Sequence, residues 1–228
     1  MAHEDPIPPR SAEEAEQLEE RLDPETRARR DVALKVIRRY GDPVLRSRAL
    51  DVERFDAALA DEARRMGQVM HDALGIGLAA PQVGVMHRLL VYRVDPDAPM
   101  ATIVNPVLEW ASEEREPMDE GCLSLPGVLV EVERPVHVRV RATDERGEDL
   151  LVEASGLEAR VLQHEIDHLD GVLILDRTVR EQRREALRAL RNGEQFDPAM
   201  LEPDEPEEPG EVTAGAEELA PEPPASQR

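Results

Sequence analysis

The 228-residue sequence has a single cysteine and no long apolar run, and its 28 basic residues are outnumbered by 50 acidic ones. One cysteine excludes an intramolecular disulfide, which fits a reducing compartment. The formal net charge of -22 argues against binding to the phosphate backbone of nucleic acids, DNA included. No stretch approaches the ~18–20 apolar residues that span a bilayer, and the first residues do not read as a secretory signal. We therefore expect a cytoplasmic protein that neither crosses a membrane nor binds DNA.

Charge divides the chain into three parts. Residues 1–31 hold ten acidic and five basic side chains, a net of -5, and residues 194–228 hold eleven acidic and one basic, a net of -10. Subtracting both from -22 leaves -7 for residues 32–193, an ordinary globular composition. The last segment also contains seven prolines and two glycines, which is typical of disorder. We expect an acidic extension over 1–31, one folded domain over 32–193 and a disordered acidic tail over 194–228.

The pattern of apolar residues in the folded part predicts both helices and strands. Helices are expected at residues 55–74, 156–170 and the arginine-rich 178–191. Strands are expected at residues 88–94, 102–104 and 150–152, and twice within 128–142, where Pro135 divides them. This order favours an α+β fold, in which short strands form small antiparallel or mixed sheets around one central helix.

The segment His164-Glu165-Ile166-Asp167-His168 has the pattern H-E-x-x-H and lies on the predicted helix 156–170. Residues four apart share a helix face, so both imidazoles can reach one metal ion. Glu165 follows the first histidine and can address a water on that metal. The alternative is a helix that carries two unrelated histidines. The amphipathic spacing around the motif favours a metallohydrolase with Glu165 as its general acid and base.

A catalytic metal of this kind usually takes a third protein ligand and leaves one position open for water. No histidine follows His168, so the candidates are Glu185 downstream and Cys122 upstream. Glu185 stands on the arginine-rich helix, where surface salt bridging is the alternative role. A lone cysteine is commonly a small buried apolar residue. Both candidates stay open on this argument alone.

The flanks of Cys122 favour it as the third ligand. Gly121 permits a close approach of the backbone, and Pro117 and Pro126 bracket what we expect to be a short irregular segment. Such a segment is a better place for a metal ligand than the interior of a strand.

The loop Gly75-Ile76-Gly77-Leu78-Ala79-Ala80-Pro81-Gln82 matches G-x-G-x-x-A, a dinucleotide-binding pattern. We reject that interpretation because a helix precedes the loop where a strand is required, and Pro81 interrupts the helix that should follow. A tight connection between helix and sheet would explain the small residues. It would not explain why the polar Gln82 ends an apolar loop.

Taken together, the segments GIGLAAPQ, EGCLS and QHEIDH resemble, in this order, the three motifs of the bacterial peptide deformylase family. The segment IRRYGDPVLR at residues 37–46 is similar to the opening segment of that family. The resemblance covers about residues 33–180, so residues 32–193 would be the catalytic domain. It implies the α+β fold of the family, and removal of the formyl group from the N-terminal methionine of new polypeptides, with release of formate.

The resemblance also implies a metal site. Cys122, His164 and His168 would bind one divalent ion, and water would take the fourth position. The ion expected from the family is Fe²⁺, with Zn²⁺, Ni²⁺ or Co²⁺ as alternatives. The softness of a thiolate ligand is compatible with iron or zinc.

Five residues would act on the substrate if the resemblance holds. Glu165 would be the catalytic acid and base. The side-chain amide of Gln82 and the backbone N–H of Leu123 would form the oxyanion hole. Ile76 and Gly77 would contact the substrate near its formyl group and peptide backbone.

Three weaker expectations concern the surroundings of the site. Arg134 would pair with Glu120, the alternative being a surface arginine. Leu129 stands where some relatives carry a basic residue, which puts contacts to the downstream peptide in doubt. The helix 178–191 could bind ribosomal RNA, as in some relatives, but an acidic tail follows it and favours a solvated surface helix.

Two other functions remain as alternatives to a deformylase that acts on N-formyl-methionyl nascent peptides. The first is a metallopeptidase that uses Glu185 as its third ligand. The second is a non-catalytic binding module on the same scaffold, which the presence of every motif residue disfavours.

Overall fold

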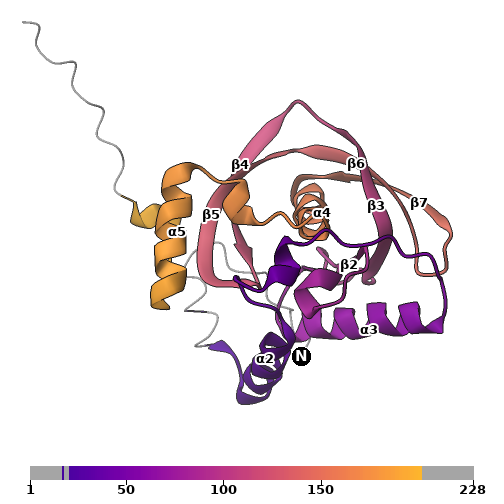
Figure 1. Cartoon of the computed structure of the whole chain (residues 1–228), viewed down its shortest axis with the longest axis horizontal. Helices are drawn as coiled ribbons and strands as arrows, with labels where there is room; N and C mark the ends of the chain where they lie inside the picture. The colour runs from indigo at the N-terminus through magenta and orange to yellow at the C-terminus, as the bar shows by residue number, and fades with distance from the viewer. Residues whose placement is uncertain (1–16, 18–20, 202–228) are drawn as a thin grey trace, which may run out of the picture.

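The computed structural model describes Gln17 and residues 21–201, which form an α+β arrangement around one helix (Figure 1). Every strand pairing is antiparallel. The larger sheet has the order β1-β2-β3-β6-β7, with β1 Gly77–Ala79, β2 Leu89–Tyr92, β3 Ala101–Ala111, β6 His137–Thr143 and β7 Asp149–Ser155. The smaller sheet is a hairpin of β4 Arg115–Cys122 and β5 Leu125–Pro135. The α+β expectation is confirmed, and the sheets are antiparallel throughout.

The central helix is α4, Gly156–Leu169, seen end-on between the two sheets in Figure 1. Ten of its fourteen residues are buried, which is the burial of a core helix and not of a surface one. Leu162 and Ile166 pack with Leu90 and Ile103 of the larger sheet. The predicted helix 156–170 is therefore confirmed to within one residue.

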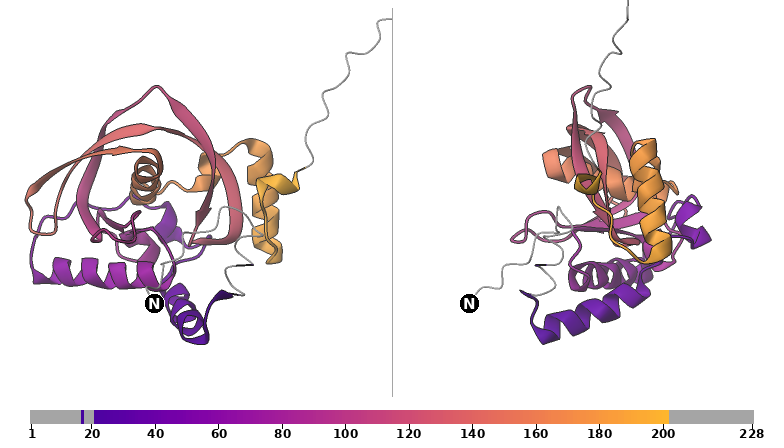
Figure 2. Two further views of the ribbon diagram at one scale, coloured as in Figure 1. Left: turned by 180° about the vertical axis from the view of Figure 1, so that it is seen from behind. Right: turned by 90° about the vertical axis from the view of Figure 1, so that its left-hand side faces the viewer.

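Two helices lie on the opposite side of the larger sheet, where the first packs on the sheet and the second packs against the first (Figure 2). They are α3 Ala57–Asp72 and α2 Pro24–Val36. Strand β2 alternates between the two layers, since Leu90 packs toward α4 whereas Leu89 packs against Met66 and Met70 of α3. Because α2 begins at Pro24, helical structure crosses the boundary expected at residue 32.

Helix α5, Arg180–Asn192, lies against the outer side of the β4–β5 hairpin (Figures 1 and 2). The chain then returns along β5: Phe196 N–H donates to the Gly127 carbonyl, and Leu129 N–H donates to the Phe196 carbonyl, each at 2.8 Å. The Phe196 side chain is buried with Ala186 of α5. The segment 194–201 is thus held against the domain at the buried Phe196 and Asp197, which differs from the disordered tail expected from 194 onward; residues 202–228 lie outside the described part.

The prediction of a short irregular segment around Cys122 is wrong. Pro117 lies inside β4, Pro126 lies inside β5, and Cys122 is the last residue of β4, just before the hairpin turn. The hairpin holds its strand form through pairing between β4 and β5 from Arg115 to Cys122.

Short 3-10 helices complete the described structure. They are Pro43–Arg46, Ala80–Val83, Ile174–Asp176 and Pro198–Met200. None of the helices in the described ranges is long and apolar enough to cross a membrane.

Candidate metal centre

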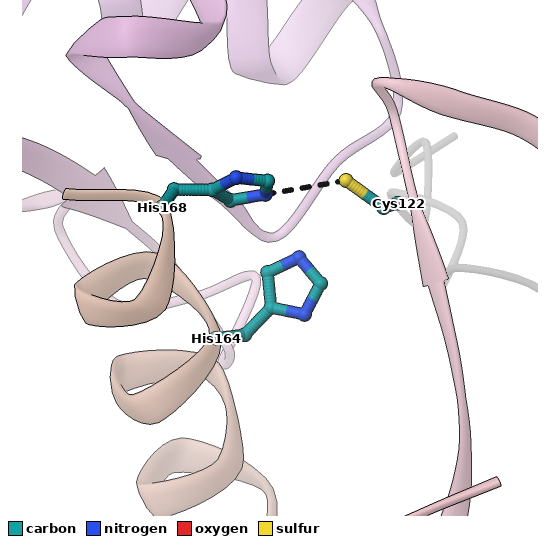
Figure 3. A group of neighbouring side chains, drawn as sticks. All are labelled: Cys122, His164 and His168. Atoms are coloured by element: carbon teal, nitrogen blue, oxygen red, sulfur yellow. Dashed lines mark hydrogen bonds between the residues drawn. The ribbon is translucent and has the colours of Figure 1, made fainter. Parts of the chain in front are cut away.

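Cys122, His164 and His168 come together where the end of β4 meets α4, as Figure 3 shows. One potential ligand atom from each residue lies within 4.8 Å of those of the other two. Cys122 Sγ is 3.2 Å from His168 Nε2. The two histidines are one helical turn apart, so the helix period brings both imidazoles to the same face. The three side chains that the sequence singled out as ligands are therefore neighbours in space.

The donor set fits a divalent transition metal. Two imidazoles and one thiol suit zinc or iron, and three protein ligands leave a position for water. Glu120 Oε2 lies 3.0 Å from His164 Nδ1, so this ring nitrogen is engaged and Nε2 is left to face the group. A carboxylate on the far nitrogen of a ligand histidine is the usual way of fixing ring orientation at a metal site.

The surroundings shift the pKa values of the two histidines in opposite directions. At His164, burial lowers the pKa, but hydrogen bonds to Cys122 and Glu120 outweigh it, and the pKa rises well above the ordinary value. At His168, burial lowers the pKa and the charge on His164 lowers it further. A metal ion binds the neutral form of an imidazole, so metal binding at this pair of histidines is expected to depend on pH.

A buried ion-pair network lies behind His164. Arg134 donates to both oxygens of Glu120, at 2.6 and 2.9 Å, and to Asp167 of α4 at 2.9 Å. Arg134 is only 4% exposed, so the expected pair with Glu120 is confirmed and the surface alternative is wrong. Burial raises the pKa of Glu120, but His164 and Arg134 lower it far more, so this carboxylate stays ionised.

Glu165 follows His164 directly in α4 and is 4% exposed. Its Oε2 is buried, with no hydrogen-bond partner among the residues that the structure describes. Burial raises the pKa of Glu165 to about 7, although His164 and Arg134 act in the opposite direction. A carboxyl group with such a pKa can both accept and donate a proton near neutral pH.

Gln82 is held so that its amide nitrogen faces Cys122. Its Oε1 accepts a hydrogen bond from Ala79 N–H at 2.9 Å. Because a backbone N–H can only donate, this contact places the amide oxygen on the far side. The Nε2 group then lies 3.3 Å from Ser124 Oγ and 3.7 Å from Cys122 Sγ. This burial beside the metal group explains why a glutamine ends the apolar loop.

The other residues expected at the site are Leu123, Gly77 and Ile76. Leu123 follows Cys122 in the hairpin turn, and its side chain lies beside Gly75. Gly77 lies against Glu165, because a Cβ added at Gly77 would be 2.9 Å from the Glu165 carboxyl carbon. Ile76 precedes β1, and its carbonyl accepts a hydrogen bond from Arg93 N–H at 2.9 Å.

Glu185, the alternative third ligand, lies away from this group. It is on α5, where it pairs with Arg184 at 2.9 Å and Arg188 at 3.5 Å. The salt-bridging interpretation of Glu185 is confirmed, which removes the basis of the metallopeptidase alternative.

Sequence reasoning missed two polar residues at this site. Arg160 is buried and contacts Glu120, and Ser124 is buried beside Gln82. A signal for Arg160 was present, since it stands four residues before His164 and so on the same helix face. For Ser124 there was none, because only the folded structure shows that Gln82 reaches it.

Comparison with known proteins adds an independent observation. The family model for polypeptide deformylase matches residues 34–184. A peptide deformylase of Acidothermus cellulolyticus is 47% identical over 163 residues, which are 72% of this chain and 89% of the relative. One from Thermosynechococcus vestitus is 51% identical over 140 residues, which are 60% of this chain and 74% of the relative.

Solved structures agree with this likeness. The crystal structure of a peptide deformylase from Synechococcus elongatus in complex with actinonin superposes with a TM-score of 0.66 and 44% sequence identity, covering 70% of this chain and 88% of that one. The peptide deformylase of Thermotoga maritima gives a TM-score of 0.60 at 45% identity, covering 63% and 96%. The similarity therefore extends from sequence to fold.

Proposed function

The chain belongs to the polypeptide deformylase family, and on this basis we propose that Cys122, His164 and His168 hold a divalent metal ion, while Glu165 moves protons during deformylation. The enzyme is a metal-dependent hydrolase that removes the formyl group from N-terminal formylmethionine. The observation that carries the residue roles is the meeting of one thiol and two imidazoles, beside which Glu165, the residue after His164, keeps a buried carboxyl oxygen without a hydrogen-bond partner among the described residues. Fe²⁺ is the ion we propose, as the family resemblance implies; a thiolate ligand is compatible with iron and equally with zinc.

Hydrolysis adds water to the formyl carbon, breaks the bond to the methionine nitrogen, and releases formate and a free amine. Cys122, His164 and His168 would hold the metal ion, which would lower the pKa of a bound water so that a nucleophile exists near neutral pH. Glu165 takes a proton from the attacking water and later passes it to the departing nitrogen. Its pKa of about 7 supports both steps, since neither protonation state is strongly disfavoured.

The formyl oxygen becomes negative as its carbon turns tetrahedral, and two donors are proposed to stabilise it. One is Gln82 Nε2, which the Ala79 contact turns toward Cys122. The other is the Leu123 backbone N–H, in the turn directly after Cys122. Loss of one such donor typically costs about 3 kcal/mol of transition-state stabilisation.

Ile76 and Gly77 are proposed to receive the peptide backbone beside the formyl group. Gly77 belongs to β1, the terminal strand of the larger sheet, so one side of β1 has no neighbouring strand within the described residues. An extended peptide can bind to such an edge through backbone hydrogen bonds. The absence of a side chain at Gly77 also keeps Glu165 open to that edge.

The substrates proposed are N-formyl-methionyl chains newly made in the cytoplasm. Several arginines of α5, which could otherwise contact ribosomal RNA, are paired with carboxylates of this chain. Arg184 and Arg188 pair with Glu185, and Arg183 lies 3.7 Å from Asp176. These pairs support a solvated surface helix. Co-sedimentation with ribosomes, with and without residues 202–228, tests this: pelleting of either form would revive the docking idea.

Formate release from formyl-Met-Ala by anaerobically purified protein, together with metal analysis, tests the proposed function. We expect one tightly bound metal ion per chain and formate in proportion to metal content. Cys122→Ser should weaken metal retention, because the hydroxyl is a poorer ligand than a thiolate. Tight stoichiometric metal in Cys122→Ser would contradict the role given to the cysteine.

A further inference from the structure

Arg160 is a buried cation on α4, one turn before His164, and is only 6% exposed. Its guanidinium donates hydrogen bonds to three acceptors that lie on the β4–β5 hairpin. They are Glu120 Oε1 at 2.7 Å, the Val132 carbonyl at 2.8 Å and the Glu116 carbonyl at 2.6 Å. This one side chain therefore joins the helix that carries two metal ligands to the hairpin that carries the third.

Glu120 connects the Arg160 contact to the proposed metal ligands. Glu120 stands two residues before Cys122 on β4, and its other oxygen meets His164 Nδ1. Arg160 thus holds the carboxylate that orients His164, and through it the strand that ends at Cys122. A shift of this contact would change the position of both ligands together.

A second contact joins α4 to the β4–β5 hairpin on the other side of His164. Arg134 of β5 donates to Asp167 of α4 at 2.9 Å. The Arg160 and Arg134 contacts therefore bracket the ligand histidine along the helix. Other hydrogen bonds between α4 and the hairpin, from Gln163 Nε2 to the Pro135 carbonyl at 3.0 Å and between His164 and Glu120, start farther along the helix than Arg160. Among the described hydrogen bonds to the hairpin, those of Arg160 therefore lie nearest the start of α4, and without them that end could move away from β4.

A gain in folding stability does not explain why an arginine stands at position 160. A guanidinium taken out of water is costly even when it is paired, and apolar residues of similar volume often stabilise a core as well or better. A leucine or methionine would serve the burial of α4 at this position. An arginine with hydrogen bonds to both strands is instead suited to fix distance and orientation.

We propose that Arg160 is a positioning residue, which sets the spacing between Cys122 and His164 by fixing α4 on the hairpin through Glu120. The inference rests on the proposed metal site. Residues that orient metal ligands typically change metal affinity by about 10–100-fold when they are replaced. We expect Arg160→Met to weaken metal binding within that range.

Arg88 offers a matched control. It is also a buried arginine that anchors α4, but at the other end, where it donates to Asp170 at 2.6 Å and to the Pro106 carbonyl at 3.1 Å. None of its described contacts involves Glu120 or a metal ligand. Arg88→Met should therefore lower unfolding stability while metal affinity stays near the wild-type value.

The experiment titrates metal-free full-length protein with Co²⁺ against a competing chelator, and records the visible and near-ultraviolet bands of thiolate-bound Co²⁺. Arg160→Met should bind about 10–100-fold more weakly, with altered bands. Arg160→Lys should lie between that variant and wild type, because an ammonium can meet Glu120 but cannot span all three acceptors. If Arg160→Met does not fold, Arg160→Lys carries the comparison with Arg88→Met.

Wild-type affinity and bands in the Arg160 variants would overturn the inference, as would an equal loss of affinity in Arg88→Met. Either result would leave the proposed function intact, since wild-type protein still binds Co²⁺ and releases formate. Failure of the wild-type protein to bind Co²⁺ would overturn the proposed function, and the inference with it.

Discussion

Gly77 and Glu165 lie so close together that a side chain at position 77 would overlap the carboxyl group of Glu165, the proposed acid and base. Gly77→Ala should therefore displace Glu165 and lower kcat/KM for formyl-Met-Ala by about 10–100-fold, a loss of the size that a misplaced catalytic group produces. Stability and metal content serve as controls, because the added methyl meets mainly the Glu165 side chain. Wild-type kcat/KM in a folded, metal-loaded variant would show that the space beside Glu165 is not used.

Gln82 should matter for the transition state and little for metal binding. In Gln82→Leu the amide donor is lost while the buried volume is roughly kept, so kcat should fall by about 100-fold or more. KM and metal content should change little, because the amide is not a metal ligand. A large rise in KM with kcat unchanged would assign Gln82 to substrate binding instead.

Glu165 should make the stability of the metal-free protein depend on pH. Burial raises its pKa to about 7 from an ordinary 4.5, whereas the unfolded chain releases this proton near pH 4.3. Between these values the folded state holds a proton that the unfolded state has lost, so stability falls as the pH rises. Glu165→Gln removes this loss and should be more stable than wild type at pH 8, by at most about 4 kcal/mol.

Urea unfolding of both metal-free proteins at pH 5 and pH 8 measures this effect. The advantage of the glutamine variant should grow between the two pH values. An advantage of the same size at both would mean that the pKa of Glu165 is not raised by burial.

Phe196 should stabilise the folded domain although it lies in the segment expected to be disordered. Its side chain is buried among β5 and α5, so Phe196→Ala should cost about 3–5 kcal/mol of unfolding free energy. Truncation after Leu201 removes none of these contacts and should leave stability within about 0.5 kcal/mol. Thermal and urea unfolding of the two proteins compare them directly, and equal stability would show that the return along β5 contributes nothing.

Local patterns predicted the central helix and the common face of its two histidines. The apolar spacing of residues 156–170 is a property of α4 itself, and the four-residue separation of His164 and His168 fixes their common face. No longer-range information is needed for either. The same holds for α3, whose apolar positions recur along one face.

Features that depend on contacts between residues far apart in the chain could not be predicted from the sequence. Strand β4 contains Pro117, Gly121 and several acidic residues, and its strand form comes from pairing with β5. The role of Arg160 depends on where the Val132 and Glu116 carbonyls lie. The burial of Phe196 was not predicted, because one aromatic residue does not change the acidic, proline-rich composition from which disorder was expected.

The measurement that tests the central claim most directly is formate release from formyl-Met-Ala by Glu165→Gln, with metal content determined on the same sample. Glutamine keeps the size of the side chain but cannot take up the proton. We expect one metal ion per chain, as in wild type, and activity lower by at least about 100-fold. Near-normal formate release by the metal-loaded variant would contradict the assignment of Glu165 as the acid and base.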